Sequence, residues 1–173
     1  MTRFEVISTR FRLGGKKRTF AGYVIISEDN LYLIARLDSA QHISTNWKNI
    51  VGPGSKLFLD PAAAQFEIDL GELRKKVYED MHWPVPLILG KALVIPRELV
   101  TEVCYKFLTG LTFHAREMPV TVPLPSKRRA KVMRQLVAYD YAVEGKDAKI
   151  HESAKAKTGE LRRFNPTEDL DLI

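Results

Sequence analysis

Runs of apolar and β-branched residues, separated by turn signals, dominate the first part of the chain. Three such runs predict β-strands at residues 4–13, 19–26 and 31–37. Gly14 and Gly15 permit a tight reversal between the first two, and Ser27 to Asn30 forms the next turn. We therefore expect a meander of three antiparallel strands, with Gly22 as a candidate β-bulge.

Helical spacing appears after a turn-rich region at residues 38–56 and a short strand at 56–59. Asp69 is followed three residues later by Glu72, which has the form of a capping box. Apolar residues then recur at helical spacing at Leu70, Leu73, Val77 and Met81. Pro84 and Pro86 end this predicted helix.

The second half of the chain returns to strand patterns before a final helix. The predicted strands are residues 87–95, 99–107, 111–117 and 119–124. Prolines confine the last of them to an edge or to a strand end. Ser126 is a plausible N-cap for a helix that runs to about Ala142, with an apolar stripe from Val132 to Tyr141.

These elements predict an α+β fold. We expect an antiparallel sheet, or a partly open β-barrel or sandwich, with an inserted helix at about 70–82 and a closing C-terminal amphipathic helix. Charged residues replace aromatic ones from Glu144 onward. The predicted organisation is thus one domain at residues 1–143 and a charged, mobile tail at 144–173.

The net charge and the hydrophobic pattern of the chain indicate its kind of partner and its location. The net charge of +6 and the pI near 9.4 favour an acidic partner, although the same charge can serve solubility alone. The N-terminus lacks the apolar core of a signal peptide, and the stretch 85–95 is too short to span a bilayer. We expect a soluble, cytoplasmic protein that can associate peripherally with a membrane.

The sequence carries no local catalytic or metal-binding signature. The glycine-rich segments at 14–17 and 52–56 do not have the order of a phosphate-binding loop. The four histidines stand singly, and a single cysteine, Cys104, excludes a disulfide and a zinc site built from cysteines. Cys104 is predicted to be a buried, inert thiol, and His114 a structural histidine. We therefore expect no enzyme activity, no cofactor and no metal.

Two clusters of basic residues are the candidate anion-binding sites. Lys16, Lys17 and Arg18 stand at the predicted hairpin tip, and Arg10 and Arg12 share one face of the strand before it. Lys127, Arg128 and Lys131 stand at the start of the last helix, where the partial positive charge of the helix favours acidic residues instead. A bound anion would offset the unfavourable energy of these basic residues at a helix start. The alternative for both clusters is ordinary solvated charge without a ligand.

The order of these elements resembles the pleckstrin-homology-like superfold, particularly its GRAM and bacterial variants. The resemblance rests on the basic hairpin, the segment from Gly22 to Tyr32, the Ile95 to Val100 segment and the closing helix, and it covers roughly residues 4–142. It implies an anionic lipid ligand gripped by Lys16, Lys17 and Arg18. One departure is that the closing helix carries no tryptophan.

The leading functional hypothesis is a non-enzymatic binding or adaptor module that recognises an anionic surface, either acidic lipid headgroups or an acidic protein. A structural subunit that docks through its basic tail, as a homo-oligomer or on another protein, is the second hypothesis. A nucleic-acid-associated protein is the third, although no motif supports it.

Overall fold

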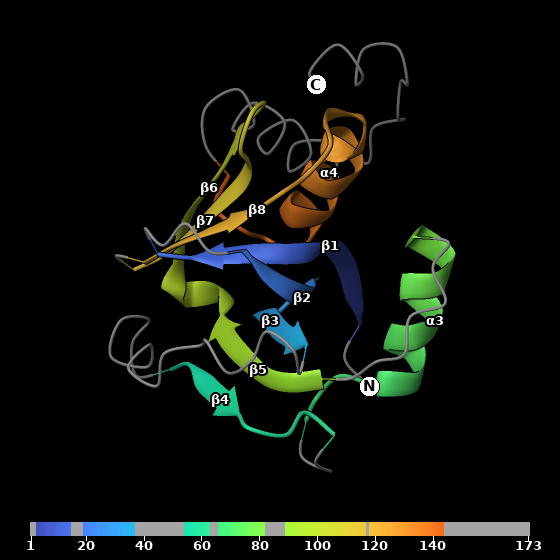
Figure 1. Ribbon diagram of the computed structural model, residues 1–173. Coiled ribbons are helices and arrows are strands. Elements are labelled where there is room, and N and C mark those ends of the chain that lie inside the picture. Colours follow the sequence, from blue (N-terminus) through green and yellow to red (C-terminus); the bar gives the residue numbers. More distant parts are fainter. Residues whose placement is uncertain are drawn as a thin grey trace, which may run out of the picture.

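The computed structural model describes residues 3–14, 19–36, 54–62, 66–81, 89–116 and 118–143 (Figure 1). The strands in these ranges are β1 (Phe4–Leu13), β2 (Phe20–Ser27), β3 (Asn30–Arg36), β4 (Lys56–Phe58), β5 (Leu89–Pro96), β6 (Val100–Lys106), β7 (Gly110–Ala115) and β8 (Met118–Val122). The α-helices are α3 (Leu70–Met81) and α4 (Arg129–Ala138), and the short 3-10 helices are η1 (Arg97–Leu99) and η2 (Ser126–Arg128).

All the strands belong to one antiparallel sheet with the order β4-β5-β3-β2-β1-β8-β7-β6. The predicted strands and the helix after Asp69 are confirmed within a few residues of their expected ends. The α+β class with an open antiparallel sheet is therefore confirmed. Figure 1 shows α3 beside one half of the sheet and α4 beside the other, with β1 running between the halves.

β1 joins the two halves because its ends pair with different strands. Residues 4–11 pair with β2, while Arg12 and Leu13 pair with β8. The β1–β2 register shifts twice, first where Ile7 has no opposite residue and again where Thr9 faces both Gly22 and Tyr23. The second shift places a bulge at Gly22, as the sequence predicted, and such bulges bend and twist a sheet.

Apolar residues on β2, β3 and β5 are buried on both faces of the sheet, which explains their nearly continuous hydrophobic runs. One face contributes Val24, Leu33 and Ile95 to a core that also contains β6, β7, β8 and α4 residues. The other face contributes Ile25 and Tyr32 to a second core beneath α3. The aromatic residues Phe20, Tyr23 and Tyr32 of the meander are therefore core residues.

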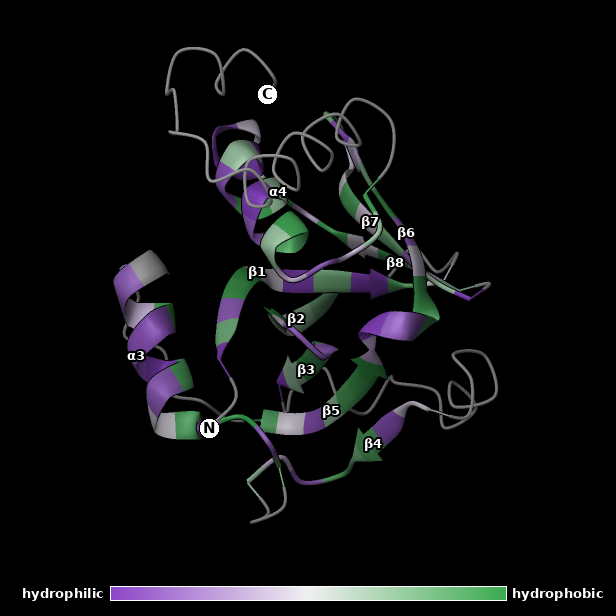
Figure 2. Ribbon diagram, turned by 180° about the vertical axis from the view of Figure 1, so that it is seen from behind, coloured by the Kyte–Doolittle hydropathy of each residue, from purple (hydrophilic) through white to green (hydrophobic). Residues whose placement is uncertain are grey.

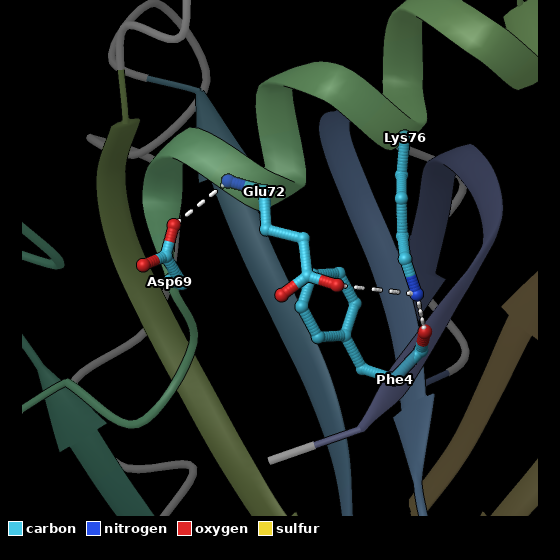
Figure 3. A network of polar contacts seen from close by, with 4 residues as sticks. All are labelled: Phe4, Asp69, Glu72 and Lys76. Atoms are coloured by element: carbon cyan, nitrogen blue, oxygen red, sulfur yellow. Dashed lines mark hydrogen bonds and ion pairs between the residues drawn. The ribbon is translucent and has the colours of Figure 1, made fainter. Parts of the chain in front are cut away.

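α3 is fastened to the sheet by a narrow apolar stripe and a polar network. Leu73 and Val77 are buried in the second core, whereas most of the helix is hydrophilic (Figure 2). A carboxylate oxygen of Asp69 accepts a hydrogen bond of 2.7 Å from the Glu72 amide, which confirms Asp69 as the cap. The Lys76 ammonium donates to the Phe4 carbonyl and lies 4.4 Å from the centre of the Phe4 ring (Figure 3).

α4 begins and ends differently from the sequence prediction. η2 precedes it, and the N-cap positions are Pro125 for η2 and Arg128 for α4, so the prediction of Ser126 as the N-cap is wrong. The helix ends at Ala138 rather than near Ala142, because Asp140 adopts a positive φ of 64°. The chain then runs alongside β6, where the Val103 amide donates to the Ala142 carbonyl at 2.6 Å.

Val132, Met133, Leu136 and Val137 are the buried residues of α4, and they face the first core. Beyond the helix, the Tyr141 hydroxyl donates to the Ser27 carbonyl at 3.1 Å, and burial raises the pKa of this phenol. This hydrogen bond ties the end of the α4 segment to β2.

The prolines of β8 have a different consequence from the one expected. β8 lies between β1 and β7, so its placement at an edge is wrong. Pro119 is the second residue of β8, where the missing N–H costs little, and its carbonyl accepts from the Gly14 amide at 2.8 Å. The alternative of a strand end is therefore the correct one.

The predicted tail at 144–173 lies outside the described residues. Neither helix in the described part of the chain has the length and apolar character needed to cross a membrane.

Gly22 offers a direct test of the sheet geometry. A Cβ atom at this position would lie 2.1 Å from the Ile34 carbonyl oxygen, and both neighbouring strands fix that backbone. We expect Gly22→Ala to lower the free energy of unfolding by about 3 kcal/mol. Ala21→Gly, one position away, is the control and costs about 1 kcal/mol or less. Urea unfolding followed by circular dichroism measures both, and equal effects would contradict the close approach.

Candidate functional site

The structure places one of the two predicted basic clusters. Lys16, Lys17 and Arg18 lie outside the described residues. Lys127 and Lys131 are exposed at the start of the α4 segment, whereas Arg128 is half-buried.

The Arg128 side chain is directed at β1. Its two terminal nitrogens donate to the Ile7 carbonyl at 3.1 Å and to the Val6 carbonyl at 3.4 Å. These carbonyls flank the first register shift of β1, where regular ladder pairing is interrupted. The forked guanidinium supplies donors to that backbone. Arg128 thus has a structural role that the sequence did not indicate.

Arg129 connects the start of α4 to the end of β6. Its guanidinium carbon lies 4.7 Å from the centre of the Tyr105 ring, within the range of a cation–π contact. Lys106, which is exposed, follows Tyr105 directly. The basic start of α4 therefore lies beside the turn between β6 and β7.

That turn, which we name the β6–β7 tip (residues 106–109), carries two exposed apolar side chains. Phe107 is 76% exposed and Leu108 is 90% exposed. Gly110 begins β7 with a φ of 87°, and a Cβ atom there would lie 2.3 Å from the Val122 carbonyl oxygen. The tip is thus held against the segment that leads into η2, and its apolar residues point into solvent instead of the core.

The net positive charge of the chain comes from one stretch of the sequence. Residues 103–139 contain one carboxylate, Glu117, and seven basic residues: Lys106, Arg116, Lys127, Arg128, Arg129, Lys131 and Arg134. The rest of the chain has equal numbers of acidic and basic residues. A count of charge by segment would have revealed this asymmetry from the sequence. The fold decides that Phe107 and Leu108, which lie in this stretch, are exposed.

A second group of chemically active side chains lies on the same hairpin. Glu102 and Cys104 stand two residues apart on β6, and His114 of β7 is opposite Glu102. Their potential ligand atoms all lie within 4.8 Å of one another. All three residues are half-buried, so the expectation of a fully buried thiol is wrong. Helical spacing in the sequence gives no signal for this group, because strand pairing assembles it.

The Tyr32 hydroxyl lies in a polar network beneath the loop that precedes α3. It donates to a Glu67 carboxylate oxygen at 2.9 Å and accepts from the Asn30 side chain at 3.2 Å. Burial is the main cause that raises the pKa of Tyr32 to about 12. The phenol therefore remains protonated at neutral pH and fastens this loop to β3.

No family model matches the chain, and no curated protein or solved structure is significantly similar to it. The function must therefore be inferred from the chemistry of the surface itself.

Arg128 and Lys127 provide a matched test of the structural assignment. Arg128→Ala leaves the Val6 and Ile7 carbonyls without this donor, so we expect the free energy of unfolding to fall by about 1–2 kcal/mol. Lys127→Ala removes the same charge from an exposed position and should change it by about 0.5 kcal/mol or less. Chemical denaturation measures both values, and an Arg128 effect as small as the Lys127 effect would refute the assignment.

Proposed function

We propose that this protein is a non-enzymatic module that binds the surface of an anionic membrane. The observation that carries the proposal is the exposed Phe107–Leu108 pair next to the exposed Lys106, together with the exposed Lys127 and Lys131 of the α4 segment, whose Arg129 stacks on Tyr105 of β6. Apolar side chains that enter the headgroup region, flanked by lysines that attract anionic lipids, are the features of an interfacial anchor. Lys16, Lys17 and Arg18 are further lipid contacts in this proposal.

The expected strength of this anchor is that of a reversible association. Burial of Phe107 and Leu108 contributes about 1.5–3 kcal/mol for each side chain. Each lysine near an anionic leaflet contributes about 1 kcal/mol. The loss of translational and rotational freedom offsets much of this total. The protein should therefore exchange between solution and membrane, as a peripheral cytoplasmic protein does.

The arrangement of the elements supports the resemblance to the pleckstrin-homology-like superfold. The β1–β2–β3 meander is followed by further antiparallel strands, and the apolar side of α4 packs on the core that both halves of the sheet share. We propose that the bent sheet is a partly open barrel and that α4 closes it. A fold of this kind can present a lipid-binding surface without any catalytic group.

Lipid is favoured over an acidic protein because the tip presents two strongly exposed apolar side chains next to Lys106, and Lys127 and Lys131 are exposed in the segment that begins α4. Guanidinium groups, which are preferred for bidentate recognition of carboxylates, serve other contacts here, since Arg128 binds β1 and Arg129 stacks on Tyr105. Lysine ammonium groups act as point charges that suit a diffuse anionic surface.

Vesicle co-sedimentation tests the proposal. We expect the full chain to sediment with phosphatidylserine-rich vesicles and to remain in solution with neutral ones. Lys127→Ala combined with Lys131→Ala should weaken binding by about tenfold to thirtyfold at low salt, and the loss should shrink at high salt. Phe107→Ser combined with Leu108→Ser should weaken binding at both salt concentrations because the apolar term is not screened.

Matched controls come from the other half of the molecule. Lys56→Ala combined with Lys75→Ala removes the same charge from exposed positions, and Leu59→Ser removes a side chain that is 69% exposed. These variants should bind vesicles nearly as well as the unaltered protein. A chain that ignores anionic vesicles at low salt would refute the membrane proposal and leave an acidic protein or nucleic acid as the partner class.

A further inference from the structure

We propose that the outer face of the β6–β7 hairpin binds one zinc ion through Glu102, Cys104 and His114. The hairpin register gathers these side chains, and this site is independent of the membrane anchor. A carboxylate, a thiol and an imidazole are brought together on this face, with their ligand atoms within 4.8 Å of one another.

The backbone of the hairpin determines this arrangement. Glu102 and Cys104 are separated by one residue on β6, so their side chains leave the same face. His114 is the cross-strand partner of Glu102, and Thr112 is the partner of Cys104, which makes the imidazole a diagonal neighbour of the thiol. Val103 and Phe113, which alternate with these residues, are buried in the first core.

The same packing makes the scaffold rigid. The outer edge of β6 is covered at Val103 by its hydrogen bond with Ala142, and β7 is paired on its other side by β8. A site on paired strands whose opposite face is fully buried holds its ligands more accurately than a site on loops. To bind zinc, the three side chains must move closer together, because bonds from zinc to sulfur, nitrogen and oxygen are about 2.0–2.3 Å long.

The donor set selects the class of metal. Thiolate and imidazole ligands suit zinc and related transition metals, whereas magnesium and calcium require oxygen ligands. Three protein ligands leave a fourth tetrahedral position open to water or to another donor. Zinc binds the thiolate, so occupation releases the thiol proton, and affinity falls as acid protonates the ligands.

The single cysteine makes the site directly observable in the full chain. We expect cobalt(II), as a spectroscopic probe for zinc, to give a thiolate charge-transfer band at one ion per chain, and zinc to abolish the band. Zinc should also slow the alkylation of Cys104 by about tenfold or more, since the coordinated thiolate is no longer a free nucleophile. The alkylation measurement needs no variant and therefore does not depend on the folding of one.

Substitutions separate a three-ligand site from adventitious binding to a thiol. Cys104→Ser should abolish the band. His114→Gln and Glu102→Gln should each weaken cobalt binding by more than about tenfold, because even changes to residues that only contact a metal ligand weaken binding by that much. The combined control His42→Gln, His82→Gln and His151→Gln removes the other histidines and should leave binding unchanged.

Two results would overturn this proposal. The first is the absence of both the thiolate band and the protection from alkylation in the unaltered chain. The second is protection that persists unchanged in His114→Gln and Glu102→Gln, because the thiol would then bind metal without its neighbours.

Discussion

The double pairing of β1 is the constraint on which the other features depend. Residues 4–11 of this strand pair with β2 and its last two residues pair with β8, and two register shifts lie between Val6 and Arg10. Such shifts interrupt the regular ladder and bend the sheet, and polar side chains support the backbone there. Arg128 donates to the Val6 and Ile7 carbonyls, and Ser8 donates to the Pro123 carbonyl at 3.1 Å. The link between α4 and β1 is therefore part of the sheet geometry.

The bend also decides which surfaces remain for function. One core lies between α3 and β2, β3 and β5, and the other is shared by both halves of the sheet and α4. The β6–β7 hairpin contributes Val103 and Phe113 to the shared core, so its opposite face and its tip are left outside. These parts of the hairpin carry the two chemistries proposed here, namely the exposed apolar tip and the half-buried ligand group at Glu102, Cys104 and His114.

Neighbouring residues of one basic run have different roles in the structure. A run such as 127–131 looks like one basic cluster, yet its members do different things. Arg128 supports a strand, Arg129 stacks on Tyr105, and Lys127 and Lys131 remain exposed. The membrane proposal therefore rests on the exposed lysines together with Phe107 and Leu108, because the structural contacts of Arg128 and Arg129 account for their presence without a ligand.

The sequence by itself determined the strands, the start of α3 and the antiparallel α+β class, because alternation, turn residues and the Asp69 cap act over a few neighbouring positions. It also contained the charge asymmetry of residues 103–139. Only the tertiary structure decided that β8 lies inside the sheet, that Arg128 faces β1 and that His114 meets Glu102 and Cys104. These outcomes depend on pairing between segments that are distant in the sequence. Burial of the whole core selects that pairing, whereas local periodicity does not encode it.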